Sequence, residues 1–277
     1  MLPLYVYINP TAGSGRALQQ WEIVRDKVLI PAHREWIECP QDVNSLPVSS
    51  DIMVIGGDGT FNQLVNTLFH PELYRYILLP AGTSNSLCTQ ISPRLSCVEK
   101  AHQYVRGARF RTMDVGELSA HGKTYRFINE SSVGFAAAIA QRIEHNGYKK
   151  LFNSLHLNEL SYIAVAFRCW AKEHPYMLSL CNNRRISGHL FPCPDAKIDD
   201  GQIDYYELRC PRWRLPFELS RLISRTKPVQ SLFVNSGRFT KQTFHFEESM
   251  PVEIDGNPID LASEVSISVY SHPITIL

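Results

Sequence analysis

The sequence predicts an α/β domain built on a parallel sheet, followed by a mainly antiparallel, β-rich domain with a few helices. Two observations lead to this division. Up to about residue 110, short apolar strands alternate with helices that carry one apolar face, as in right-handed βαβ units. Beyond that point most of the expected elements are strands. We expect one domain over residues 1–112 and a second over 113–270, with the tail from about 271 to 277 packing back on the first.

The first half alternates strand and helix. Strands are expected at Leu4–Ile8, near Glu35–Cys39, at Asp51–Ile55 and at Tyr76–Leu79. Helices are expected around the apolar face of Ala17, Trp21, Val24 and Val28, after Thr60, and from a capping box of Ser96 and Glu99 to about Gly107. Open parallel sheets bind ligands beyond the carboxyl ends of their strands, so the turns after these strands are the places to look for a site.

The second half shows strand patterns with little helix. We expect a hairpin of Arg109–Leu118 and Lys123–Glu130 around residues 120–122, then helices over about 135–146 and 158–172. Further strands are expected at 176–181, 184–191, 202–209, 239–246, 250–254 and 264–270.

Composition sets wide bounds on function. The 277 residues include 28 basic and 27 acidic side chains, a net charge of +1, so nothing recommends nucleic acid as a partner. Seven cysteines form no CxxC pair, which is typical of reduced thiols in the cytoplasm. No leader segment and no run of about 20 apolar residues is visible. We expect a cytoplasmic protein that can still touch a membrane surface.

The turn at Gly56–Thr60 reads GGDGT and carries the strongest chemical signal. It joins an apolar strand to a helix, where free backbone N–H groups and the helix dipole attract anions. Its three glycines allow a phosphate to approach the backbone closely. Asp58 is the unusual member, because a carboxylate beside phosphate is repulsive unless it handles a metal ion or a proton. The turn therefore predicts phosphoryl transfer.

Two other loops follow strands in the same way. Residues 9–16 read NPTAGSGR, in which the glycines permit close backbone approach and Arg16 can reach a phosphate. The spacing is not that of a Walker loop. Residues 80–86 read PAGTSNS and offer hydroxyl and amide groups. Either loop alone is commonplace, but three such loops after successive strands favour a phosphate site.

These three segments, in this order, resemble the diacylglycerol kinase catalytic family, which includes bacterial lipid kinases and the sphingosine kinases. The second half agrees with the resemblance through MDVG at 113–116, PDAKIDDG at 194–201 and VEIDG at 252–256. The turn GGDGT by itself is shared with NAD kinases and phosphofructokinases. The resemblance implies an NAD kinase- and diacylglycerol kinase-like fold, with an ATP-binding α/β domain, a β-rich lipid-acceptor domain and a cleft between them.

The resemblance also implies cofactors and site residues. The cofactors would be ATP and Mg²⁺, and the acceptor a hydroxyl of a diacylglycerol- or sphingoid-like lipid. Asp58 or Asp255 would serve in catalysis, and Asp114 would support the metal network. A second, structural Mg²⁺ would be held by Asp200 and the carbonyls of Lys197 and Gln202, oxygen ligands that suit a hard cation. The expected nucleotide-binding residues are Asn9, Gly13, Gly15, Arg16, Gly56, Gly57, Asp58, Gly59, Thr60, Asn62, Thr83, Asn85 and Asp114.

Three positions depart from the family pattern. Ser86 replaces an acid that sphingosine kinases also lack, and Ala136 replaces a carboxylate thought to face the acceptor. Asn257 replaces the glutamate proposed as general base in bacterial members, and an amide cannot accept a proton near neutral pH. Two alternatives therefore stay open. One is a catalytically impaired pseudokinase that binds nucleotide or lipid. The other is an NAD kinase, because residues 127–130 (FINE) resemble an Asn-Glu pair of those enzymes.

Overall fold

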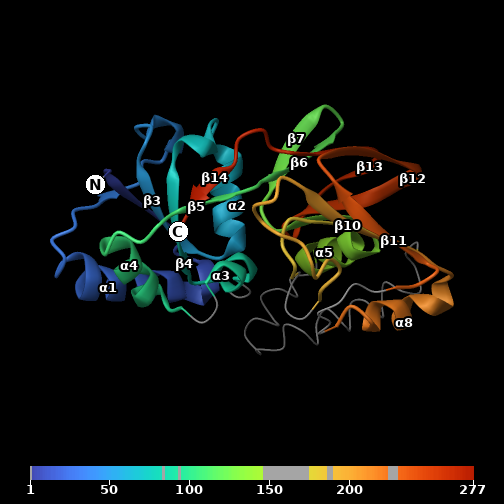
Figure 1. Ribbon diagram of the computed structural model, residues 1–277, viewed down its shortest axis with the longest axis horizontal. Helices are drawn as coiled ribbons and strands as arrows, with labels where there is room; N and C mark the ends of the chain where they lie inside the picture. Colours follow the sequence, from blue (N-terminus) through green and yellow to red (C-terminus); the bar gives the residue numbers. More distant parts are fainter. Residues whose placement is uncertain (1, 83–84, 93–94, 146–174, 186–189, 224–229) are drawn as a thin grey trace. The chain divides into compact units, whose positions relative to one another are not determined.

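The structure is a computed structural model and describes residues 2–82, 85–92, 95–145, 175–185, 190–223 and 230–277 (Figure 1). The expected helix at 158–172 and residues 186–189 of the expected strand at 184–191 lie outside these residues. The described rest of that expected strand is wrong as a strand, since it forms only an isolated bridge between Leu190 and Ile223. The chain divides into two compact units. Unit 1 comprises Met1–Val115 and Tyr270–Leu277, and unit 2 comprises Gly116–Val269.

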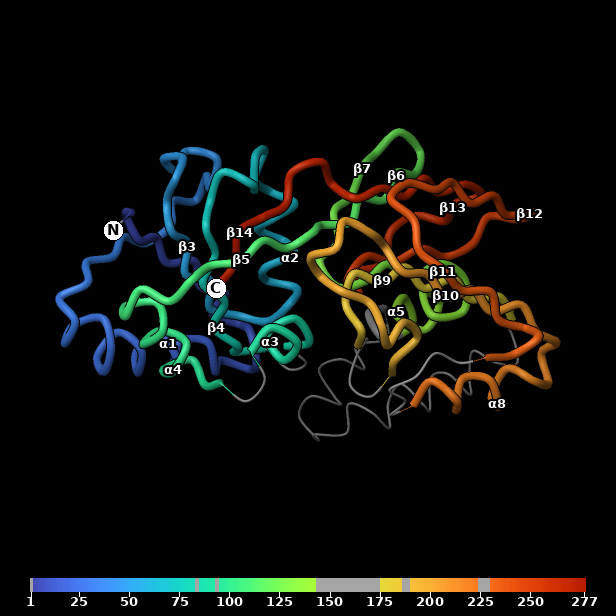
Figure 2. Tube along the Cα trace, viewed as in Figure 1, coloured from blue at the N-terminus to red at the C-terminus, as the bar shows by residue number. Residues whose placement is uncertain are grey.

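Unit 1 is organised around a mostly parallel sheet. Within the described residues the sheet has six strands in the order β2-β1-β3-β4-β14-β5. All neighbours run parallel except β14 and β5. The last strand of the chain, β14, therefore lies between β4 and β5, as the tube in Figure 2 also shows. The strands span Leu4–Ile8 (β1), Ile37–Glu38 (β2), Asp51–Gly56 (β3), Arg75–Pro80 (β4), Arg111–Met113 (β5) and Ile274–Ile276 (β14).

The helices of unit 1 follow the strands. They span Arg16–Val24 (α1), Asp58–Thr67 (α2), Ser86–Ile91 (α3) and Cys97–Val105 (α4), with short turns at Ala12–Gly15 (η1), Arg25–Leu29 (η2), Val43–Ser45 (η3) and Pro71–Leu73 (η4). The predicted capping box is confirmed, since Ser96 and Glu99 hydrogen-bond each other's backbone N–H groups at the start of α4. Trp21, Ala101 and Leu277 pack in one apolar core with residues of β1, β3 and β4.

At the amino end of β3, a buried ion pair fixes the sheet. Asp51 is fully buried and accepts two hydrogen bonds from the Arg75 guanidinium, at 2.7 and 2.9 Å. The Tyr104 hydroxyl on α4 donates a third, at 2.9 Å. A buried carboxylate is tolerated when it is paired and hydrogen-bonded in this way. The network joins β3, β4 and α4, and it lies at the opposite end of the strands from the glycine-rich turns.

Unit 2 is built on an antiparallel sheet. Within the described residues it has eight strands in the order β11-β10-β9-β8-β12-β13-β6-β7, and every neighbouring pair is antiparallel. The strands span Gly116–Ala120 (β6), Lys123–Phe127 (β7), Glu130–Gly134 (β8), Tyr176–Cys181 (β9), Ile203–Arg209 (β10), Val234–Phe239 (β11), Lys241–Ile254 (β12) and Asn257–Val269 (β13). The described residues of the unit also form helix α5 (Phe135–His145), the short turn Arg212–Arg214 (η5) and helix α8 (Leu215–Ser220).

The predicted fold class is confirmed, with local corrections. The expected hairpin strand Arg109–Leu118 is wrong as a single element, because Arg111–Met113 pairs with the distant β14 and only Gly116–Ala120 forms the hairpin with β7. The expected strands 239–246 and 250–254 join into β12, whose register shifts around Pro251, a residue that has no N–H to donate. Strands β8 and β11 and helix α3 were not predicted.

Among the described residues, no helix combines the length and the apolar character that a membrane crossing requires.

Candidate active site

Three loops of unit 1 meet because their strands end at one edge of the sheet. Ile8 of β1 pairs in parallel with Ile55 of β3, and Gly56 of β3 pairs with Pro80 of β4. The loops that leave these strands are the three predicted from the sequence. Asn9 donates its backbone N–H to the Ile55 carbonyl, so the first loop starts against the second strand. This is the edge where open parallel sheets bind ligands.

The first loop is tied to the GGDGT turn by a side-chain hydrogen bond. The Asn9 amide nitrogen donates to Thr60 Oγ1 at 3.1 Å, and Asn9 Oδ1 accepts from the Thr11 hydroxyl at 2.8 Å. Thr60 is buried in the first turn of α2. The hydroxyl of Thr60 therefore positions the first loop in addition to belonging to the expected phosphate turn.

Two glycines bring the backbones of the second and third loops into contact. A Cβ atom on Gly82 would lie 2.4 Å from the Gly57 Cα, and one on Gly57 would lie 2.9 Å from the Gly82 Cα. Any side chain at either position would force the two backbones apart. The glycines therefore allow the two loops to approach each other closely, and the predicted approach of a phosphate to these glycines stays a prediction.

Arg16 ties the first loop to the third. Its Nε donates to the Gly13 carbonyl and its Nη2 to the Gly82 carbonyl, both at 3.0 Å. Gly13 has a φ of 58°, and a Cβ there would lie 2.2 Å from the Ala81 carbonyl oxygen. The guanidinium thus carries a positive charge at the start of α1 while it holds two loops together.

Asp58 anchors the third loop. The backbone N–H of Ser86 donates to Asp58 Oδ2 at 2.7 Å, and that of Leu87 donates to Oδ1 at 3.2 Å. These are N–H groups of the first turn of α3, which has no carbonyl partner for them within the helix. The carboxylate of α2 therefore caps a second helix. Sequence reasoning missed this role, because nothing local links residue 58 to residues 86 and 87.

Of the other expected nucleotide-binding residues of unit 1, those described lie in or near these loops, with the exception of Asp114. Asn85 adopts a left-handed conformation and closes the third loop through two hydrogen bonds with the backbone of Gly82, at 3.0 and 2.9 Å. Asn62 is buried on α2 and accepts from the Asn66 side chain. Asp114 is buried just after β5 and lies away from these loops, because Met113 pairs with Ile274 beside the amino end of β4. Gly15 and Gly59 have no neighbouring atom within 4 Å of an added Cβ, and Thr83 lies outside the described residues.

In unit 2, Asp255 is held by three backbone donors. The N–H groups of Ile128, Asn129 and Glu130 donate to its carboxylate at 2.7, 2.8 and 3.0 Å. Asp255 and Gly256 have φ values of 47° and 81°, and they form the two-residue loop between the paired residues Ile254 and Asn257. Asp-Gly in such a loop is a strong hairpin signal, which could have predicted this turn. The carboxylate joins the β12–β13 hairpin to the segment that enters β8.

Two buried glutamates lie beside Asp255, and sequence reasoning did not single out either as part of a carboxyl cluster. Glu253 accepts from the Ser132 hydroxyl at 2.7 Å and from the Gly256 N–H at 2.6 Å. Burial raises the pKa of Glu253 to about 7, and the charge of Asp255 adds to this rise. Burial also raises the pKa of Glu130 well above its ordinary value, and the neighbouring Glu253 contributes. The strand pattern hides these groups, since it marks them only as polar positions.

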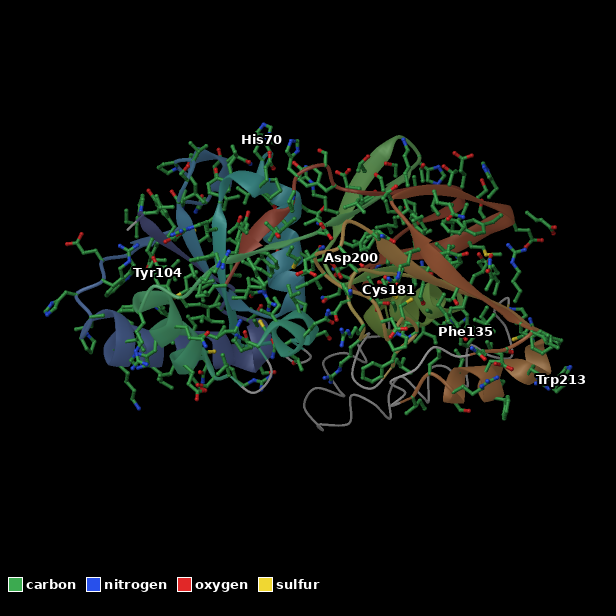
Figure 3. All side chains as sticks on the ribbon, viewed as in Figure 1. His70, Tyr104, Phe135, Cys181, Asp200 and Trp213 are labelled. Carbon is green, nitrogen blue, oxygen red and sulfur yellow. The ribbon has the colours of Figure 1, made fainter. Side chains whose placement is uncertain are left out.

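The segment with the predicted structural metal site forms a turn directly before β10. Asp200 Oδ1 accepts the Gln202 N–H at 3.2 Å, and Gly201 has a φ of 71° (Figure 3 labels Asp200). In the described part of the chain, no group of three or more His, Cys, Asp or Glu side chains is arranged to hold a metal ion. The predicted magnesium site uses one carboxylate, that of Asp200, and two backbone carbonyls. The absence of a cluster of three side chains therefore does not test it, and the magnesium site stays a prediction.

The three positions that depart from the family pattern are now placed. Ser86 starts α3, and its N–H is one of the two donors to Asp58. Ala136 lies in the first turn of α5 and packs against an apolar cluster of unit 2. Asn257 is exposed at the start of β13, directly after the Asp255-Gly256 turn.

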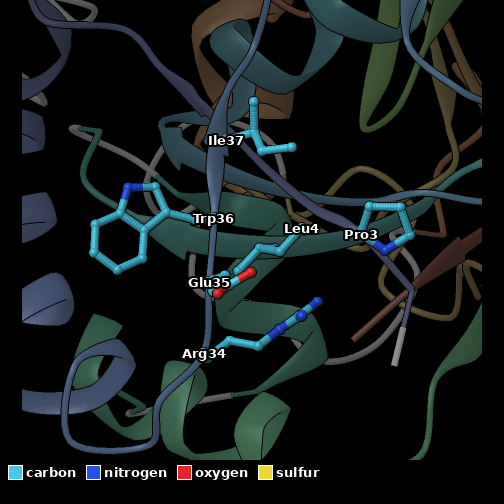
Figure 4. A pocket seen from close by; sticks show the side chains of 6 residues that line it. All are labelled: Pro3, Leu4, Arg34, Glu35, Trp36 and Ile37. Carbon is cyan, nitrogen blue, oxygen red and sulfur yellow. The ribbon is translucent and has the colours of Figure 1, made fainter.

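A hollow elsewhere on unit 1 is separate from these loops. It has a volume of about 410 Å³ and is lined by Pro3, Leu4, Arg34, Glu35, Trp36 and Ile37, beside the edge strand β2 (Figure 4). Arg34 there donates to the Tyr104 hydroxyl at 2.7 Å. Leu4 begins β1 and Pro3 directly precedes it, so the hollow lies at the amino ends of the strands, away from the converging loops.

Comparison with known proteins supports the resemblance to one family. Residues 3–118 match the family model described as the diacylglycerol kinase catalytic domain, and this range contains all three loops. This part of the chain is therefore similar to the diacylglycerol kinase catalytic domain. The resemblance inferred from the loops is thereby confirmed.

Curated relatives and solved structures agree with this assignment. A Pseudomonas aeruginosa protein named "Probable lipid kinase YegS-like" is 26% identical over 74% of this chain and 69% of its own length. A protein of the same name from Stenotrophomonas maltophilia is 24% identical over 75% of this chain and 72% of its own length. The crystal structure of a Bacillus anthracis diacylglycerol kinase matches with a TM-score of 0.69 at 16% identity, covering 99% of this chain and 96% of that one. At this identity the structural match shows the shared fold.

Proposed function

We propose that this protein is a lipid kinase that binds ATP with Mg²⁺ on the three converging loops of unit 1 and phosphorylates a hydroxyl of a diacylglycerol- or sphingoid-like lipid. The observation that carries the proposal is the contact of Gly57 with Gly82 at the carboxyl edge of a parallel sheet, directly before α2. The match of residues 3–118 to the diacylglycerol kinase catalytic domain and the names of the curated relatives support it.

The loops offer two kinds of group that attract phosphate. The first turn of α2 presents backbone N–H groups and the positive end of the helix dipole. Arg16 adds a full positive charge next to the first and third loops. Because Asn9, Arg16 and Asp58 fix the loops to one another, the phosphate-binding groups are already in place before a ligand arrives. Such preorganisation lowers the cost of binding.

We assign Asp58 to a magnesium ion that accompanies the nucleotide, since oxygen ligands suit this cation. Asp114, which was expected to support the metal network, lies toward the amino ends of the strands and is not part of this assignment. Bound Mg²⁺ would neutralise charge that develops on the phosphate oxygens. In this proposal, Asp58 organises the site and is less suited to accept a proton, since its two oxygens already accept N–H groups from Ser86 and Leu87.

Asp255 is also poorly suited to accept a proton as a general base. Three N–H donors occupy its carboxylate, and hydrogen bonds to the charged form oppose protonation. Phosphoryl transfer depends chiefly on positioning and charge stabilisation, and base catalysis contributes about 10²–10⁴-fold. We therefore propose that the chain transfers phosphate without a dedicated base at position 257, at a correspondingly reduced rate.

Three variants test whether nucleotide binding depends on the contact between the loops and on the open backbone of the GGDGT turn. Gly82→Ala should abolish the Mg²⁺-ATP-dependent rise in melting temperature and the transfer of labelled phosphate to lipids, because the Ala Cβ would collide with Gly57. Gly59→Ala should weaken nucleotide binding while the fold stays intact, since no atom lies within 4 Å of its Cβ. Thr67→Ala, at the far end of α2, is the matched control and should bind ATP as the wild type does. If the wild type shows no thermal response to Mg²⁺-ATP, the proposal is wrong.

A second candidate is a protein that binds nucleotide or lipid without turnover. The exposed amide of Asn257, at the position of the expected family glutamate, favours it. Asn257→Glu, alone and with Ala136→Asp, distinguishes the two. Phosphate transfer that appears only in these variants would establish the binding-only function, and robust wild-type transfer would exclude it. An NAD kinase would be revealed by phosphate transfer to NAD in the same assay.

A further inference from the structure

Unit 2 carries an aromatic and basic surface that shares no residue with the proposed phosphate site. It lies on the segment from η5 through α8 to Ile223, and Figure 3 shows Trp213 at the outer edge of this unit. Trp213 is 70% exposed and Phe217 is 57% exposed. Large apolar side chains that gather on a surface mark an interaction site more often than single ones do.

The exposure of these rings follows from how α8 packs. Leu215, Glu218 and Leu222 face inward and are buried. Glu218 is held by Arg221 at 3.1 Å and by Arg214 at 3.6 Å, so this acid is neutralised beneath the surface. With the inward face already filled, the aromatic side chains point to solvent. They are available to a partner without any rearrangement of the helix.

Arginines are interleaved with the rings. The Arg214 guanidinium lies 5.6 Å from the Trp213 ring centre, 5.4 Å from that of Phe217 and 5.1 Å from that of Phe233. Arg221 lies 5.9 Å from the Phe217 ring. Arg212 is exposed beside Trp213. From Arg212 to Ile223 the segment has three arginines and one buried acid, so its outward face is positive.

We propose that this surface, formed by Arg212, Trp213, Arg214, Phe217 and Arg221, docks on a bilayer that contains anionic phospholipid. Charge complementarity selects this occupant: cationic side chains meet anionic headgroups, while Trp and Phe enter the boundary between headgroups and acyl chains. Arginine stems that lie along aromatic rings keep the charged ends at the headgroup level. The surface would bring a lipid-directed enzyme to its substrate, so this part of the inference rests on the proposed function.

Vesicle binding tests the surface without any need for turnover. The wild type should co-sediment with phosphatidylcholine vesicles that contain phosphatidylserine, and weakly with pure phosphatidylcholine. The double variant Trp213→Ser with Phe217→Ser should lower partitioning at least about tenfold, given the apolar area removed. Arg212→Gln should lower it about fivefold on the anionic vesicles alone. Melting curves should coincide with that of the wild type, because all three side chains are exposed.

Two controls keep the inference separate from its alternatives. Phe69→Ser removes a ring that is 74% exposed on unit 1, and this variant should bind vesicles like the wild type. Asp58→Ala disrupts the proposed phosphate site but should leave vesicle binding unchanged, so failure of the kinase proposal and failure of this one are distinguishable. The inference is overturned if the wild type ignores anionic vesicles or if Phe69→Ser has the same effect as the double variant. It is also overturned if the surface proves to mediate self-association, seen as a concentration-dependent dimer that the double variant abolishes.

Discussion

The GGDGT turn of unit 1 and the Asp255 turn of unit 2 both hold a distant segment of backbone, but the charged groups around the two turns differ. In each, an aspartate accepts backbone N–H groups from a distant segment: residues 86 and 87 for Asp58, and residues 128–130 for Asp255. The segments around Asp58 are glycine-rich and hold the positively charged Arg16. Asp255 instead lies beside the buried acids Glu253 and Glu130.

The difference shows that an aspartate in a turn can either belong to a ligand site or stabilise the fold, depending on the charged groups around it. Backbone donors and a nearby cation favour a second anion at the first turn, which is what a nucleotide phosphate provides. Buried carboxyls disfavour any further negative charge at the second turn. We therefore assign phosphate binding to the Asp58 turn and a structural role to the Asp255 turn, and four variants test this comparison.

Asp255→Ala should have the largest effect on stability. It strands three N–H donors and places alanine at a φ of 47°. Hydrogen bonds to a charged group contribute about 1.5–3 kcal/mol each and are not fully additive, so we expect a loss of about 4 kcal/mol in the free energy of unfolding. Urea denaturation measures it. Asp255→Asn, which keeps one acceptor and tolerates this φ, should lose less, and an equal loss would contradict the anchoring role.

Glu253→Gln should flatten the dependence of stability on pH. The pKa of Glu253 is raised from 4.5 to about 7, so between these values the folded state binds more protons than the unfolded state. Stability contributed by this group is thus present below about pH 4.5 and is lost as the pH rises to about 7, by about 3 kcal/mol.

Denaturation from pH 4.5 to 8 checks this behaviour. The raised pKa of Glu130 contributes in the same direction and is retained in the variant, so some slope should remain. Glu247→Gln, at an exposed position of the same strand, is the control and should match the wild type. A wild type whose stability rises across this window would refute the assignment.

Asp58→Ala should cost less stability than Asp255→Ala but should remove more function. Two N–H donors lose their partner instead of three, and Asp58 is only half-buried, so water can replace its carboxylate. We expect a loss of about 2 kcal/mol in unfolding free energy, together with loss of the thermal response to Mg²⁺-ATP. Asp58→Asn should restore part of the stability. If Asp58→Ala binds nucleotide as well as the wild type does, phosphate binding cannot be assigned to the Asp58 turn.

Gly59→Ala should have the smallest effect on stability, and in the opposite direction. Gly59 lies within α2 and an added Cβ meets no atom within 4 Å, so alanine should stabilise the helix by about 0.5–1 kcal/mol. The same methyl group would stand where we place the phosphate, so the affinity for ATP should fall. A variant that is more stable and also binds ATP normally would move the phosphate away from this turn.

Much of unit 1 could be predicted because its signals are local. Strand β3 is a continuous apolar run, the face of α2 repeats with the helical period, and the Ser96–Glu99 capping box spans four residues of one helix start. The three loops were predicted as a set because each directly follows a strand, and parallel pairing of β1, β3 and β4 then brings them to one edge.

The errors fell where partners are distant in sequence. Arg111–Met113 pairs with Ile274–Ile276, and no local pattern could have separated it from the hairpin that follows. The buried acids of unit 2 were missed for the same reason, since Glu130 and Glu253 come from β8 and β12 and meet only through strand pairing. The Asp255-Gly256 turn could have been predicted, because the Asp-Gly dipeptide is a local signal for a hairpin.

By itself, the sequence determined the family resemblance, the fold class and the three phosphate-type loops, because glycine spacing and hydrophobic period act over a few residues. Only the tertiary structure decided what the two aspartates touch. Asp58 and Asp255 look alike in sequence, each beside glycine in a turn, and their roles depend on groups 28 and about 126 residues away. Hydrogen bonds and burial act through space, so the same carboxylate becomes part of a proposed ligand site in one place and a clamp for the fold in the other.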